Sequence, residues 1–256
     1  MSFLSLVGVE FKKIQRSKIF LILISATVIL WVPSILNADL NFSMQAEGIS
    51  PENNFFIQGF MGMAWFLFPA TMVVITVLQT QTERSNHGIL KMLALPVNTA
   101  KLCMAKFVVL VSFSAIQFLM SIGMYYISIA IAGHTQNYDF FLAPLFVFKE
   151  VGMMWMSSIP MLAFFWLLAV CIQTPIFSIG IGLASIVPSV LMINTKVWFA
   201  YPMAYPFFVI TAEYGKLAAN LSMTRVDLIP WIPVAALITV VCLMITCIRF
   251  GQAERR

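Results

Sequence analysis

Residues 107–132 read FVVLVSFSAIQFLMSIGMYYISIAIA, a run without a charged residue in which Gln117 is the clearest polar interruption. A helix needs about 20 mostly apolar residues to cross the hydrocarbon core of a bilayer, and this run is long enough. The whole chain has a similar character: of 256 residues, 61% are hydrophobic and only 10% are charged. Soluble domains carry about 25% charged residues. The sequence therefore predicts an integral membrane protein.

Five further runs have the length and composition of a membrane span. The six predicted spans cover residues 19–36, 57–80, 107–132, 151–172, 175–194 and 228–248. The fourth and fifth are separated only by the tripeptide that ends in Pro175, which predicts a tight hairpin. The connecting stretches are too short to form a soluble domain. We therefore predict an all-α protein with one transmembrane domain over residues 1–256.

The basic residues favour one orientation in the membrane. With the N-terminus inside, eleven of the 15 Lys and Arg residues fall in inner segments, and four fall in outer ones: Lys149, Lys196, Lys216 and Arg225. Positive residues are retained on the cytoplasmic side, so both termini are predicted to be cytoplasmic. The net charge of +5 then describes topology, and no nucleic-acid partner is expected.

Residues 1–18 predict an amphipathic helix. Its apolar residues recur at helical spacing: Phe3, Leu4, Val7, Phe11 and Ile14. Three basic residues project elsewhere: Lys12, Lys13 and Arg16. Such a helix either lies among the lipid headgroups of the inner leaflet or packs against neighbouring helices or a partner subunit.

The most distinctive stretch is residues 81–97, QTERSNHGILKMLALPV, which faces the cytoplasm in this topology. It contains a short apolar helix around Leu93 that should end before Pro96, since proline disfavours helical geometry at Leu95. Asn98 or Thr99 can cap the next helix. Exposed apolar residues without a covering domain indicate a partner surface. The alternative is a solvated connector whose apolar side rests on lipid.

This stretch carries a family resemblance. A Glu near the inner end of the second span, followed by Gly, Lys, Leu-Pro and a basic re-entry into the third span, resembles the type-2 ABC exporter permease family. In that family this loop forms a coupling helix that docks on the nucleotide-binding subunit. The resemblance implies a coupling region at Glu83, Gly88, Lys91, Leu95 and Pro96, with Leu93 in its apolar helix.

The size of the chain narrows the resemblance. A compact chain without a large extracellular domain is similar to the permeases of lantibiotic immunity and bacitracin resistance. This implies a subunit that confers immunity or resistance to membrane-active antimicrobial peptides in a bacterial cell membrane. The expected partners are two copies of an ABC ATPase, a second and non-identical permease, and membrane lipid. An exporter of an ion, lipid or glycan, and a non-transporting sensor or assembly subunit, remain alternatives.

An aromatic outer segment, residues 196–227, is too broken to span the membrane and too apolar to stay in water. We predict a re-entrant or interfacial pair of short helices there. Its aromatic residues either anchor the chain at the interface or contact a membrane-bound substrate. The residues concerned are Trp198, Tyr201, Tyr205 and Phe208. In the middle of the third predicted span, Gln117 either forms a hydrogen bond to another helix or contacts the substrate.

Catalytic motifs are absent from the sequence. There is no G-x-x-x-x-G-K-[ST] loop for ATP phosphates, no H-E-x-x-H and no G-x-S-x-G, and the two histidines, His87 and His134, fall in different loops. We therefore expect a non-enzymatic subunit that holds no metal or cofactor. ATP and Mg²⁺ are expected on the partner ATPase.

Overall fold

The computed structural model describes residues 2–15, 17–43, 47–85, 98–217 and 228–253. Within these ranges all regular structure is helical, in agreement with the predicted fold class. The elements are α1 (Phe3–Gln15), α2 (Ile19–Leu36), α3 (Leu40–Ser43), α4 (Pro51–Gly62), the π-helix η1 (Met63–Leu67), α5 (Phe68–Ser85), α7 (Thr99–Gln136), α8 (Pro144–Ser157), α9 (Ile159–Cys171), α10 (Pro175–Ala184), α11 (Ser189–Met192), the 3₁₀ turns η2 (Trp198–Ala200) and η3 (Pro202–Ala204), α12 (Tyr205–Leu217) and α13 (Leu228–Ala253).

Six helical stretches of the described chain are long and apolar enough to cross a membrane. They are Ile19–Leu36, Pro51–Gln81, Thr99–Gln136, Pro144–Cys171, Pro175–Met192 and Leu228–Phe250. The second and third begin earlier than the predicted spans because their first turns contain polar residues and escape a search for apolar runs. The fourth begins earlier because the charged pair Lys149-Glu150 separates its apolar first turn from the run that follows. Pro51 and Pro144 occupy the first helical position, where the missing N–H costs nothing. The Asn98 side chain caps α7 by accepting hydrogen bonds from the amides of Ala100 and Lys101.

Prolines also shape the interior of two spans. Pro69 cannot donate a hydrogen bond to the turn before it, and the π-helix η1 lies directly before Pro69 in the long helix from α4 to α5. The fourth span is divided at Ser158, and Pro160 lies in the first turn of α9. Both spans are therefore bent rather than straight.

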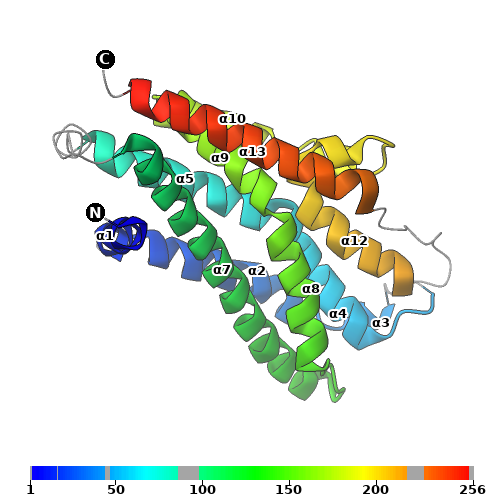
Figure 1. Ribbon diagram of the computed structural model, residues 1–256. Helices are drawn as coiled ribbons and strands as arrows, with labels where there is room; N and C mark the ends of the chain where they lie inside the picture. Colours follow the sequence, from blue (N-terminus) through cyan, green and yellow to red (C-terminus); the bar gives the residue numbers. More distant parts are fainter. Residues whose placement is uncertain (1, 16, 44–46, 86–97, 218–227, 254–256) are drawn as a thin grey trace.

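The six spans form a bundle with two distinct ends (Figure 1). The end that carries α1 and the close of α13 is called here the terminal end. The opposite, distal end carries α3 and α12. The outer surfaces of α2, α10 and α13 are mostly apolar and exposed, with only 22%, 22% and 6% of their span residues buried within the chain. Such surfaces suit a hydrocarbon environment.

An aromatic cluster fills the interior of the distal half. Trp31 of α2 lies edge to face with Phe60, at 5.3 Å between ring centroids, and 5.7 Å from Tyr125 of α7. This packing needs Gly59, because a Cβ there would stand 2.6 Å from the Trp31 ring. The second span therefore approaches the first as closely as a backbone without a side chain allows.

Candidate functional sites at the two ends of the bundle

At the terminal end α1 packs against α7 through a buried ion pair. The Glu10 carboxylate accepts from the Lys106 ammonium at 2.7 Å, with side chains only 2% and 1% exposed. Lys13 of α1 donates to the second Glu10 oxygen at 2.6 Å. Leu6 and Ile14 are buried on the same helix. Of the two interpretations of residues 1–18, packing against neighbouring helices is what the structure contains, and a position among lipid headgroups stays a prediction.

Lys106 of α7 also accepts a hydrogen bond from α5. The Gln79 side-chain amide donates to the backbone carbonyl of Lys106 at 3.0 Å, and both groups are buried. α5 is the helix that leads into the predicted coupling region. Three elements, α1, α5 and α7, are therefore joined at Lys106.

The coupling region itself is only partly within the described chain. Glu83 lies in α5, near its end at Ser85. The other residues assigned to this region lie outside the described residues: Gly88, Lys91, Leu93, Leu95 and Pro96. Their role in coupling stays a prediction.

At the distal end the aromatic segment forms short helical pieces, α11, η2, η3 and α12. Trp198 stacks on Phe208 with 3.6 Å between ring centroids and 15° between planes. The Tyr201 hydroxyl donates to the Ser185 carbonyl, and that of Tyr205 donates to the Phe199 carbonyl. Burial raises the pKa of Tyr201 and raises that of Tyr205 to about 12, so both remain neutral donors at ordinary pH. These aromatic residues hold the segment together.

Beside this segment lies a groove of 620 Å³ between α8, α9, α12 and α13, here called the distal groove. Its walls are largely apolar and include Met153, Met156, Ile159, Val209, Trp231 and Ile232. Its charged lining residues are Glu150 and Lys216. Among the predicted substrate-facing residues, Tyr205 lines this groove. The rings of Trp198 and Phe208 lie next to the Trp231 ring, with 5.4 and 6.2 Å between ring centroids.

Sequence reasoning missed Glu150 and Trp231. Glu150 comes directly before the fourth predicted span, residues 151–172, whereas α8 begins six positions earlier at Pro144 and places Glu150 inside the helix. Glu150 is only 2% exposed. The signal available in the sequence was a Lys-Glu pair beside an apolar run, which marks an amphipathic helix start as readily as a site.

Gln117 lies at the centre of α7 and is completely buried. Neither its amide nitrogen nor its amide oxygen has a hydrogen-bond partner among the described residues, so the helix-to-helix hydrogen bond considered for it is not formed. The hydroxyls of Ser121, Tyr125 and Ser128 are likewise buried without partners. These residues follow one face of α7 at helical spacing. A substrate contact for Gln117 stays a prediction.

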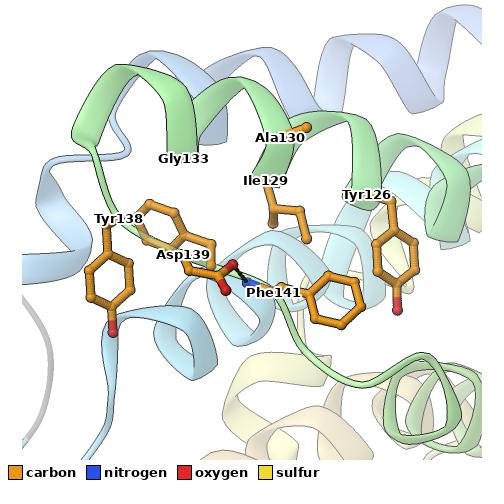
Figure 2. Close-up of a pocket in the computed structure, with 8 residues that line it drawn as sticks. Tyr126, Ile129, Ala130, Gly133, Tyr138, Asp139 and Phe141 are labelled. Carbon is orange, nitrogen blue, oxygen red and sulfur yellow. Dashed lines mark hydrogen bonds between the residues drawn. The ribbon is translucent and has the colours of Figure 1, made fainter.

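A second distal cavity, of 390 Å³, lies where α7 ends (Figure 2). Figure 2 shows the Asp139 carboxylate turned toward the Phe141 amide, from which it accepts a hydrogen bond of 3.0 Å. The Tyr138 hydroxyl donates to Glu52 at 2.6 Å. The polar groups Asp139 and Tyr138 of this cavity therefore stabilise the turn that follows Asn137. Asn137 has a φ of 51° and ends α7.

In the described part of the chain no cluster of His, Cys, Asp and Glu could hold a metal ion. An all-helical chain with six helices able to cross a membrane is a multi-pass membrane protein. Residues 6–189 match the family model of the ABC-2 family transporter proteins, and the chain belongs to that family. It is accordingly a membrane permease subunit of an ABC transporter, which implies an ABC ATPase partner. No curated protein and no solved structure matches the chain.

Proposed function

We propose that this chain is the permease of an ATP-driven exporter that removes membrane-active antimicrobial peptides, of the lantibiotic or bacitracin type, and so confers immunity or resistance. The observation that carries the proposal is the distal groove. It combines apolar walls, an aromatic border and one buried carboxylate, which suits an amphipathic ligand that arrives from the bilayer. Transport of a small ion would not need apolar walls of this extent.

Energy would enter at the terminal end. Two copies of the ATPase would bind ATP and Mg²⁺, and their closure would act on residues 82–97 and thereby on α5. Because Gln79 and Glu10 both bond Lys106, this displacement would move α1 and α7 together. A second, non-identical permease would complete the assembly in the bacterial cell membrane, with both termini in the cytoplasm.

Copurification tests the partnership. We expect the tagged chain, expressed with its neighbouring genes, to bring down an ABC ATPase whose turnover in nanodiscs rises when a lantibiotic or bacitracin is added. Glu83→Ala and Leu93→Ala should reduce that stimulation by uncoupling the subunits. Leu237→Ala, at a 63% exposed position of α13, is the matched control and should leave it unchanged.

The outcomes separate the alternatives. If ions, lipids or glycans stimulate ATP turnover and peptides do not, the cargo is one of these and not a peptide. Binding of an ATPase without any ligand-dependent turnover would indicate a sensor or assembly subunit. If no ATPase copurifies and both coupling variants retain function, the proposal is wrong.

A further inference from the structure

The distal groove adjoins the surface of the bundle that suits lipid. Met156 of α8 is 64% exposed, and Leu228 and Ile232 of α13 are each 55% exposed. These side chains lie at the groove and are apolar, so a molecule dissolved in the bilayer could enter sideways. The groove is therefore accessible to an amphipathic ligand without passage through water.

The charges beside the groove are unequally paired. The Lys216 ammonium donates to Glu213 at 2.8 Å, so this cation already has a carboxylate partner. Glu150 has a longer contact, 3.7 Å from the ammonium of Lys149, whose side chain is 69% exposed. Glu213 repels the charge of Glu150, while Lys149 and Lys216 attract it. Among the described residues the Glu150 carboxylate is thus buried with one long contact to an exposed ammonium, and such groups are costly unless they are closely paired.

The neighbouring aromatic rings suit the same kind of partner. Trp231 and Tyr205 both line the groove and meet edge to face at 5.6 Å. Tyr205 is fully buried, whereas Trp231 is partly exposed and can meet a ligand, and the face of a tryptophan ring attracts cations. The Trp231 indole N–H is buried and has no acceptor among the described residues. The groove therefore offers a carboxylate and a tryptophan ring together.

We propose that the distal groove binds a Lys or Arg side chain of a membrane-bound amphipathic peptide and that Glu150 pairs with its cationic group beside the Trp231 ring. This inference rests on the proposed function and specifies its ligand. A phospholipid with an amine headgroup offers the same ammonium. However, its phosphate would lie beside Glu150 and Glu213 and be repelled, which favours the peptide.

The test measures binding to the full chain in phosphatidylcholine nanodiscs by fluorescence anisotropy, so it does not depend on the ATPase. The probe is a dansylated amphipathic Leu–Lys peptide, and empty nanodiscs give the background. Because a hydrogen bond to a charged group is worth about one order of magnitude or more in affinity, Glu150→Gln should weaken binding at least about tenfold. Glu150→Asp should retain most of it. Glu52→Gln, at a distal carboxylate outside the groove, should bind as the wild type does.

Two further arms need no variant. A peptide with Glu in place of every Lys should bind the wild-type chain at least about tenfold more weakly, and equal binding would overturn the proposal. Phosphatidylethanolamine in the nanodisc should leave peptide binding unchanged, whereas displacement by it would assign the groove to a lipid amine instead. If Glu150→Gln binds the Leu–Lys peptide like the wild type, the groove assignment is wrong, although peptide-stimulated ATP turnover could still support the proposed exporter.

Discussion

Two buried carboxylates at opposite ends of the bundle are equally hidden but differently paired. Glu10 and Glu150 are each 2% exposed. Glu10 lies 2.6 and 2.7 Å from two ammonium groups, whereas Glu150 lies 3.7 Å from one. The Lys106 partner of Glu10 lies 96 positions away in the sequence, while the Lys149 partner of Glu150 is its neighbour in the chain. Burial alone therefore does not distinguish a structural charge from a binding charge, but the completeness of its pairing does.

The largest effect should follow from removing the buried partner of Glu10. Lys106→Met removes the buried ammonium, and breaking a buried ion pair in this way costs about 3 kcal/mol or more. Thermal unfolding of the purified chain in detergent measures the loss. Lys13→Met is the matched control, because its side chain is 34% exposed and pairs of this kind contribute about 1 kcal/mol or less. Equal losses in the two variants would mean that the buried pair is not a structural centre, and Glu10→Gln combined with Lys106→Met should recover part of the difference.

The next effect tests whether the distal end is loosely packed in general or open only at its groove. Gly59→Ala would place a Cβ 2.6 Å from the Trp31 ring, and overpacking of this kind costs about 2 kcal/mol. Gly123→Ala has no atom within 4 Å of the new Cβ and should gain roughly 0.5 kcal/mol from helix propensity. Thermal unfolding of both variants compares them. If Gly59→Ala is as stable as Gly123→Ala, the aromatic cluster is adaptable and the distal end is loose throughout.

The two ends also differ in how far the sequence could predict them. Apolar runs were sufficient for six spans, and the cap was expected at Asn98 or Thr99, of which the structure uses Asn98. The ion pair of Glu10 and Lys106 could not be predicted from the sequence, because it depends on how α1 crosses α7. At the distal end the aromatic composition located the segment around Tyr205. Which of its rings face a groove depends on the packing of α8 and α13, which no local pattern encodes.

Glu150→Gln should change stability by less than Lys106→Met and in the opposite direction. The amide keeps the shape of the side chain and removes a poorly paired buried charge, so we expect a gain of about 1 kcal/mol or less. Thermal unfolding in the same detergent measures it beside Glu10→Gln, which should lose stability. A loss for Glu150→Gln as large as that for Lys106→Met would show that both carboxylates are structural.

The smallest effect concerns a distal hydrogen bond that is short but only partly buried. The Tyr138 hydroxyl donates to Glu52, and this hydrogen bond raises the pKa of Tyr138 above the ordinary tyrosine value of about 10. The folded chain therefore holds this proton more tightly than the unfolded chain does. Its contribution to stability is complete below about pH 10 and is lost as pH rises through the raised pKa of the folded state. Tyr138→Phe should cost less than about 1 kcal/mol at neutral pH, because solvent screens the contact. Unfolding curves of wild type and Tyr138→Phe should converge as the pH rises above about 10. Equal stability of the two chains already at neutral pH would show that ring packing against Phe42 and Phe140, which the variant keeps, rather than the hydrogen bond, holds this turn.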